Sequence, residues 1–167
     1  MMNFTSTQAV GYFDERVIDI ANKAGKTVID WDEVFSAFGD SLDPTKTIIQ
    51  VWHSGNSLMP DVVKAGFRAI YSPDPIWYLD HLSTTWQDRY VLEPFEYITD
   101  PSQQKLVIGG EACMWGETVD VSDIQQTIWP TAAAVAERLW SPQNNNDTNL
   151  SKQQQKWYRN SSTQSSN

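Results

Sequence analysis

The chain has 167 residues, enough for one domain with a sizeable core but fewer than the roughly 250 residues of a complete (β/α)8 barrel. Its 21 acidic and 12 basic residues give a net charge of −9. The sequence has no cluster of lysine or arginine that could bind a phosphate backbone, which argues against nucleic acid as a partner. No apolar run approaches the ~20 residues of a membrane span, so no transmembrane segment is expected. The first seven residues also lack the basic and apolar blocks of a signal peptide.

The first third of the chain predicts one helix and two strands. Apolar positions at helical spacing, at Phe13, Val17, Ile20 and Ala24, predict a helix over about residues 12–24 that stops at Gly25. Two short runs rich in β-branched residues follow at 27–29 and 47–51. Both runs predict buried strands.

The middle third continues the alternation of helix and strand. Apolar residues over 58–65 mark one face of a short helix that ends before Gly66, and residues 67–71 form a third strand. A long irregular segment is expected over 74–104. Residues 105–108 then predict the fourth strand.

The last third predicts one helix and a polar tail. Pro130 suits the first position of a helix, whose buried side is predicted to consist of Ala132, Val135, Ala136, Leu139 and Trp140. Residues 143–167 are rich in Asn, Gln and Ser and predict a disordered tail. The domain organisation is therefore a partial barrel over 1–142 followed by this tail.

Strands that alternate with helices predict an α/β fold with a parallel sheet. Aromatic and polar residues follow each predicted strand, and this placement favours four units of a (β/α)8 barrel over an open sheet, because functional side chains collect at the carboxyl ends of barrel strands. The clusters are Trp31-Asp32-Glu33, Trp52-His53, Trp77-Tyr78, and Glu111 with Trp115 and Glu117. The alternative is that these large aromatic side chains only seal the core.

The segment Gly109–Glu117 is the most informative single motif. Two glycines allow a sharp change of backbone direction after a strand. Two carboxylates and an indole then follow within seven residues. A core does not require this mixture, so the segment predicts a binding site.

Several motifs in a fixed order resemble the C-terminal half of a β-N-acetylhexosaminidase. They are Trp31-Asp32-Glu33-Val34-Phe35, Ile48-Ile49-Gln50-Val51-Trp52, Lys64-Ala65-Gly66-Phe67-Arg68-Ala69, Trp77-Tyr78-Leu79-Asp80, Gly109 to Glu117, and Trp129-Pro130 with Ala134 to Ser141. The resemblance implies the last four strands of a (β/α)8 barrel. It also implies hydrolysis of terminal N-acetylglucosamine or N-acetylgalactosamine from glycoconjugates, in which the 2-acetamido oxygen of the sugar attacks the anomeric carbon.

The same resemblance implies no metal and no organic cofactor. Cys113 is the only cysteine, and with only His53 and His81 beside it the chain lacks a plausible zinc ligand set. We expect Cys113 to be a small buried hydrophobic side chain.

Catalysis in the family depends on an Asp-Glu pair within a His-x-Gly-Gly-Asp-Glu motif, and these 167 residues do not contain that motif. Two other pairs of neighbouring acids, Asp14-Glu15 and Asp32-Glu33, are possible substitutes. We do not assign the acid to Asp14-Glu15, because acids near a helix start are usually solvated and favoured by the helix dipole. We do not assign it to Asp32-Glu33, because the resemblance gives the pocket role in that motif to Trp31. No catalytic residue is therefore predicted.

The resemblance assigns the wall of the sugar pocket to residues that are present. Trp31, Trp52 and Trp115 are expected to enclose the acetamido methyl group and the apolar face of the pyranose. Tyr78 is expected to donate its hydroxyl to the acetamido carbonyl. Glu117 is expected to accept hydrogen bonds from the C4 and C6 hydroxyls.

Two further acids, Asp80 and Glu111, are also considered for the site. Asp80 is expected near the C6 edge of the sugar, where its charge would repel a sulfate group. Glu111 either contacts the pocket or only braces neighbouring loops.

Two functions remain open at this stage. The chain is either part of a hydrolase or a non-catalytic remnant, which would be a sugar-binding protein or an inactive truncated gene product that does not fold alone. Four strands with two open edges predict aggregation or dependence on a partner half, with negligible turnover. Members of the family often dimerise and often work in lysosomes or outside the cell, which the resemblance extends to this chain as an expectation. Possible glycosylation sequons begin at Asn3, Asn146, Asn149 and Asn160.

Overall fold

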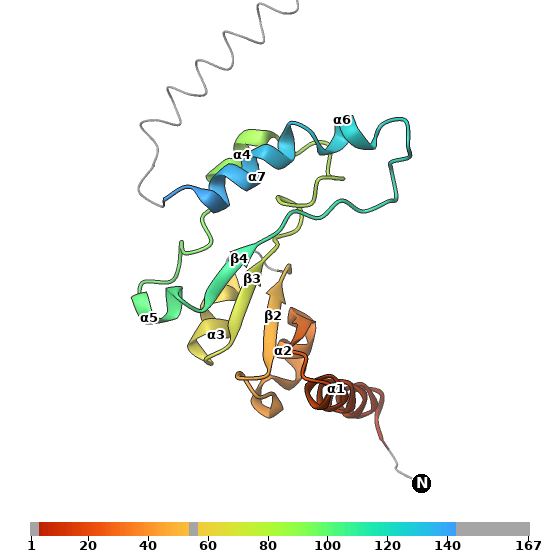
Figure 1. The fold of residues 1–167 in the computed structure, drawn as a ribbon, viewed down its shortest axis with the longest axis vertical. Coiled ribbons are helices and arrows are strands. Elements are labelled where there is room, and N and C mark those ends of the chain that lie inside the picture. The colour runs from red at the N-terminus through yellow and green to blue at the C-terminus, as the bar shows by residue number, and fades with distance from the viewer. Residues whose placement is uncertain (1–3, 54–56, 143–167) are drawn as a thin grey trace, which may run out of the picture.

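The computed structural model describes residues 4–53 and 57–142, which form a four-stranded parallel sheet flanked by helices (Figure 1). The strands are β1 (Val28–Trp31), β2 (Thr47–Val51), β3 (Arg68–Tyr71) and β4 (Val107–Gly110). Their order in the sheet is their order in the chain, and each strand pairs in parallel with the next. The predicted parallel α/β arrangement of four strands is therefore confirmed.

Helices precede and follow these strands. They are α1 (Ser6–Lys23), α2 (Asp32–Phe38), the 3-10 helix η1 (Gly39–Ser41), α3 (Met59–Lys64), α4 (Trp86–Val91), α5 (Pro101–Gln104), α6 (Ile124–Ile128) and α7 (Thr131–Trp140). Helices α4 and α7 pack against each other beyond the carboxyl end of the sheet (Figure 1). Within the described part of the chain, no helix is long and apolar enough to cross a membrane.

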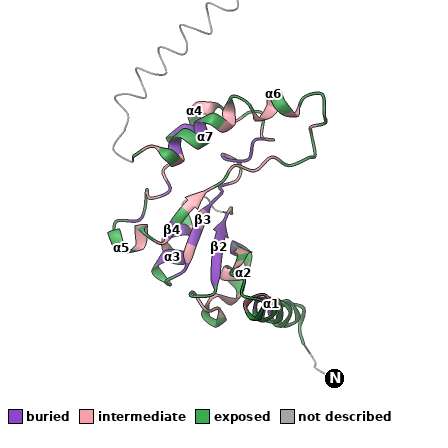
Figure 2. Ribbon diagram, in the orientation of Figure 1, coloured by how far each residue is buried: buried purple, intermediate pink, exposed green. Residues whose placement is uncertain are grey.

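The core lies between one face of the sheet and the helices that cover it. Strand β2 is buried along its whole length, as predicted (Figure 2). Alternate residues of β2 and β3, such as Ile49 and Tyr71, pack with Val62 of α3 and with Trp77 from the segment after β3. These contacts fix the carboxyl ends of the strands, where the aromatic clusters are found.

Helix α1 differs from its prediction in its start. It begins at Ser6 because Thr5 and Gln8 form a capping box that satisfies the first backbone N–H groups. The side chains of Phe13, Val17 and Ile20 are exposed. Helix α1 packs on β1 and α2 through its other side, which includes Ile18 and Gly11.

The two edge strands also differ from prediction. Strand β1 includes Trp31, and it is only partly buried because no strand pairs with its outer edge among the described residues. Strand β4 is shifted by two residues and contains both glycines, so the chain does not turn at them. A Cβ atom on Gly110 would lie 2.6 Å from the Trp77 ring, so a close approach explains this glycine.

Two further predictions are corrected. The segment 74–104 contains α4, which Thr85 and Asp88 cap, and α5, so it is not irregular throughout. In α7, Val135 is buried as predicted, but Ala136 is exposed and Trp140 is 90% exposed, while Ala134 and Arg138 are buried instead. The predicted tail over 143–167 and the four sequons lie outside the described residues.

Candidate functional site

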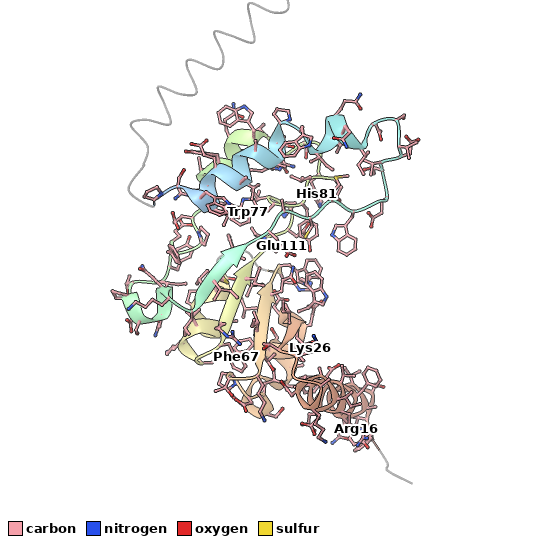
Figure 3. The ribbon with its side chains drawn as sticks, viewed as in Figure 1. Arg16, Lys26, Phe67, Trp77, His81 and Glu111 are labelled. Carbon is pink, nitrogen blue, oxygen red and sulfur yellow. The ribbon has the colours of Figure 1, made fainter. Side chains whose placement is uncertain are left out.

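The carboxyl ends of the four strands and the segments after them meet at a pocket of about 470 Å³. It contains all six side chains predicted to bind substrate: Trp31, Trp52, Tyr78, Asp80, Trp115 and Glu117. It also contains Glu33, Asp74 and His81, which the sequence analysis did not assign to the site. Figure 3 shows His81, Trp77 and Glu111 at this end of the sheet and Phe67 at the opposite end.

The aromatic rings of the pocket form a continuous series. Trp31 meets Trp52 edge to face at 6.1 Å between ring centroids. Trp52 stacks on Tyr78 at 6.0 Å and an interplanar angle of 19°, and Tyr78 lies 6.4 Å from Trp115. Trp31 and Trp115 are 39% and 45% exposed, which leaves indole surface for a ligand. Such surfaces suit the apolar C–H face of a sugar ring.

Asp32 holds Trp52 in this series. Its carboxylate is buried, and Oδ2 accepts hydrogen bonds from the backbone N–H groups of Trp52 at 2.9 Å and His53 at 2.8 Å. Its Oδ1 lies 2.8 Å from Nδ1 of the His53 ring. Because Asp32 begins α2 directly after β1, it links the end of β1 to the end of β2.

Glu33 lies beside Asp32 but faces the pocket. It accepts a hydrogen bond from the Trp52 indole N–H at 3.0 Å. Desolvation acts to raise its pKa, but hydrogen bonds from its own backbone N–H and from Trp52, with the charge of His53, outweigh that effect and hold the pKa of Glu33 below its usual range. Glu33 is therefore a poor proton donor.

Asp32, Glu33 and His53 could also be considered as metal ligands. Their ligand atoms lie within 4.8 Å of one another. Both oxygens of Asp32 already accept hydrogen bonds that hold Trp52 and His53. The cluster is thus explained by the support of the pocket wall, and we assign no metal to it.

Tyr78 is positioned by pairing with the segment after β4. The backbone N–H of Leu79 donates to the carbonyl of Cys113 at 2.7 Å, and the N–H of Cys113 donates to the carbonyl of Trp77 at 2.9 Å. Tyr78 and Cys113 form a parallel bridge. Burial, followed by the charge of a Cys113 thiolate, raises the pKa of Tyr78 to about 12, so its hydroxyl remains a hydrogen-bond donor well above neutral pH.

The side chains of Cys113 and Glu111 contact neighbouring segments of the fold. The thiol of Cys113 is half-buried, with its sulfur 3.2 Å from the Ser72 hydroxyl, and burial raises its pKa. The predicted full burial of Cys113 is thus not observed. Glu111 does not line the pocket, and its carboxylate accepts a hydrogen bond from the side chain of Gln50 on β2. Of the two roles considered for Glu111, the bracing role agrees with this contact.

The rim of the pocket is acidic. Asp80 has a buried Oδ1 atom without a hydrogen-bond partner, and Glu117 is exposed. The Asp74 Oδ1 atom lies 2.9 Å from Nε2 of His81. The sequence signal that could have identified these two residues is their place beside the Trp77-Tyr78 cluster after β3. A rim of this charge disfavours anionic ligands, and its carboxylates can accept hydrogen bonds from hydroxyl groups.

Comparison with known proteins identifies related sequences. The model of the glycosyl hydrolase family 20 catalytic domain matches residues 2–143. Beta-hexosaminidase 1 of Arabidopsis thaliana is 52% identical over 139 residues, which cover 83% of this chain and 25% of that protein. The alpha subunit of beta-hexosaminidase from Mus musculus is 41% identical over 143 residues, covering 80% of this chain and 26% of that protein. The chain therefore spans about a quarter of the length of these curated relatives.

Two solved structures share the fold. The chitobiase of Flavobacterium johnsoniae superposes with a TM-score of 0.72 at 24% identity, covering 90% of this chain and 23% of that one. The beta-N-acetylhexosaminidase of Bacteroides fragilis superposes with a TM-score of 0.73 at 21% identity, covering 94% and 35%. The parallel sheet and its helices thus correspond to part of a (β/α)8 barrel. On the match of the family model over residues 2–143, the chain belongs to glycosyl hydrolase family 20.

Proposed function

We propose that the pocket binds a terminal N-acetylhexosamine of a glycoconjugate, and that a complete catalytic domain containing this chain is a β-N-acetylhexosaminidase. The observation that carries the proposal is the series of three indoles and one phenol around a pocket of about 470 Å³. Indole faces stack well on the apolar face of a pyranose. The acidic rim suits a neutral sugar.

Five of the residues that line the pocket hold the sugar in this proposal. Trp31, Trp52 and Trp115 enclose the acetamido methyl group and the underside of the ring. Tyr78 donates its hydroxyl to the acetamido carbonyl and so holds that oxygen near the anomeric carbon, where proximity favours intramolecular attack. Glu117 accepts hydrogen bonds from the C4 and C6 hydroxyls, which fixes the orientation of the sugar.

No residue of this chain is assigned as the proton donor for hydrolysis. Glu33 faces the pocket, but its lowered pKa keeps it ionised at mildly acidic pH, so it would not protonate a leaving oxygen efficiently. The 167 residues contain no His-x-Gly-Gly-Asp-Glu motif. We therefore propose that the chain alone has negligible turnover, and this observation also favours the second candidate function, sugar binding without catalysis.

The proposal extends to the setting of the protein. Glycans that end in N-acetylglucosamine or N-acetylgalactosamine would be its partners, without a metal or organic cofactor. By family resemblance, the expected compartment is the lysosome or the extracellular space. By the same resemblance, the protein is expected to associate into dimers.

A fluorescence titration tests the binding function. N-Acetylglucosamine should quench tryptophan emission of the purified chain in a saturable manner, because the sugar would stack on Trp115. Trp115→Ala should abolish the saturable change. Trp140→Ala is the matched control, since this indole is 90% exposed on α7 and does not line the pocket, and it should leave the change intact. Saturable quenching that persists in Trp115→Ala would contradict the proposed pocket.

The same titration tests Asp80. A 6-sulfated N-acetylglucosamine should bind more weakly than the neutral sugar, because the sulfate would approach the Asp80 carboxylate. Asp80→Asn should narrow the difference. Equal affinity for the two sugars in the wild-type chain would contradict the proposed role of Asp80.

A turnover assay tests the assignment of the acid. The purified chain should release no measurable aryl alcohol from an aryl N-acetylglucosaminide. Sustained hydrolysis that Glu33→Gln abolishes would show that Glu33 is the proton donor after all. Hydrolysis unaffected by Glu33→Gln would place the donor elsewhere in the chain.

A further inference from the structure

A buried arginine lies behind the pocket, outside the set of residues that line it. Arg89 of α4 is only 1% exposed, and buried guanidinium groups are rare unless their donors are satisfied. No carboxylate lies within ion-pair distance of Arg89 among the described residues. The reason for its burial must therefore be sought in its hydrogen bonds.

The guanidinium of Arg89 binds backbone carbonyl groups of the loop 78–85. Its Nη2 atom donates to the carbonyls of Tyr78 and His81, each at 3.2 Å. Its Nη1 atom donates to the carbonyls of Thr84 and, at 3.3 Å, Thr85. A single planar group thus connects both ends of the loop, which a shorter or more compact cation could not do.

The loop carries three of the pocket side chains, Tyr78, Asp80 and His81. Its own backbone hydrogen bonds are few, and two of them, from His81 to Tyr78 and from Thr84 to His81, are turn contacts at 3.3 and 3.0 Å. The bridge between Tyr78 and Cys113 orders only the start of the loop, so the rest of the loop needs another source of order. The four carbonyl contacts of Arg89 provide it.

Arg89 is itself held in place from two directions. Its backbone carbonyl accepts a hydrogen bond from the Trp77 indole N–H at 2.9 Å, and Trp77 is fully buried. The next residue, Tyr90, donates its hydroxyl to Glu137 of α7 at 3.1 Å. The loop is therefore tied through Arg89 to the packed pair α4 and α7.

Charge supports the same arrangement. Burial lowers the pKa of Arg89, while the charges of Asp88 and Asp80 oppose that shift. Asp80 has a buried Oδ1 atom without a hydrogen-bond partner, so the nearby guanidinium offsets part of the cost of burying its charge. Loss of Arg89 would thus affect the charge of the pocket as well as its backbone.

We propose that Arg89 is the positioning residue of the pocket, whose contacts with the carbonyls of loop 78–85 set the places of the Tyr78 hydroxyl and the Asp80 carboxylate. Arg89 does not touch the ligand. This inference rests on the proposed function for what the loop binds, but the order that Arg89 imposes on the loop can be measured without any sugar.

Amide hydrogen exchange of the full chain, followed by mass spectrometry, tests the proposal. In Arg89→Met, exchange of the peptide over 78–85 should rise at least about tenfold, because loss of the charge-assisted hydrogen bonds makes local opening of the loop easier. Arg89→Lys keeps the charge but lacks the planar fork, so it should give a smaller rise in the same peptide. The peptides of β2 and β3 should change less than the loop.

Arg138→Met is the matched control. Arg138 is also buried, but it bonds to the carbonyl of Ser141 and pairs with Glu93, so its loss should leave exchange over 78–85 at the wild-type rate. The proposal would be overturned if Arg138→Met raised the exchange rate over 78–85 as much as the Arg89 variants do. It would also be overturned if Arg89→Lys raised the exchange rate evenly over the whole chain. A rise confined to the loop in either Arg89 variant supports it.

Sugar binding gives a second readout. Where the wild-type chain binds N-acetylglucosamine, Arg89→Lys should weaken binding several-fold more than Arg138→Met does, and equal effects would count against the proposal. A wild-type chain that does not bind the sugar would contradict the proposed function, and the exchange result would still decide the role of Arg89.

Discussion

Asp32 and Glu33 are neighbours in the sequence, but their different burial gives them different roles. Asp32 is 1% exposed and accepts three hydrogen bonds, whereas Glu33 is exposed and accepts one from the Trp52 indole. The sequence analysis treated the two as one acidic pair. Burial separates them, because α2 begins at Asp32 and turns its first side chain under the end of β2.

The pair provides a stability prediction. Asp32→Asn should lower the free energy of unfolding by roughly 1–3 kcal/mol, because a buried, charge-assisted set of hydrogen bonds loses its acceptor charge. Glu33→Gln is the matched control and should change that free energy by no more than about 0.5 kcal/mol, as is usual at the surface. Urea unfolding of the three proteins measures both values. Equal effects of the two substitutions would contradict the assigned roles.

At the element scale, the parts of the fold that could be predicted are those with strong local signals. The run 47–51 is fully buried as a strand because its residues are apolar or β-branched on both faces. Helices α4 and α5 were missed because each is shorter than two turns, although Thr85 with Asp88 and Asp100 with Pro101 were visible start signals. The start of α1 was placed too late, because the prediction followed the apolar positions and not the capping box of Thr5 and Gln8.

The candidate site was predictable to a similar extent. The gathering of Trp31, Trp52, Tyr78 and Trp115 follows from parallel strands, whose carboxyl ends meet at one edge. The position of Arg89 could not be inferred, because it depends on the path of the loop after β3.

Strand β4 provides a prediction of its own. Gly110→Ala should destabilise the chain by roughly 1–3 kcal/mol, because the added methyl group would lie 2.6 Å from the Trp77 ring and 2.7 Å from the Tyr71 carbonyl oxygen. Gly116→Ala, in the same motif, meets nothing within 4 Å and should be nearly neutral. Thermal unfolding compares the two variants. If Gly110→Ala leaves the stability of the chain unchanged, the contact between β4 and Trp77 is looser than described.

At the scale of the whole molecule, the described sheet has two edges without a partner strand. Ile29 of β1 and Ile108 of β4 are about half exposed, and α1 presents Phe13 and Ile20 to solvent. Such edges and apolar surfaces favour association. The pocket opens at the carboxyl end of the same sheet, so its ligand would bind to a wall that further strands of a barrel could enclose.

An NMR titration with N-acetylglucosamine of the chain carrying 15N-labelled tryptophan tests whether indoles from separate strands form one sugar-binding wall. The indole N–H signals of Trp31, Trp52 and Trp115 should shift together along one saturation curve, while Trp129 and Trp140, which do not line the pocket, stay in place. Shifts confined to Trp129 or Trp140, or three pocket indoles that titrate with unrelated curves, would contradict the claim.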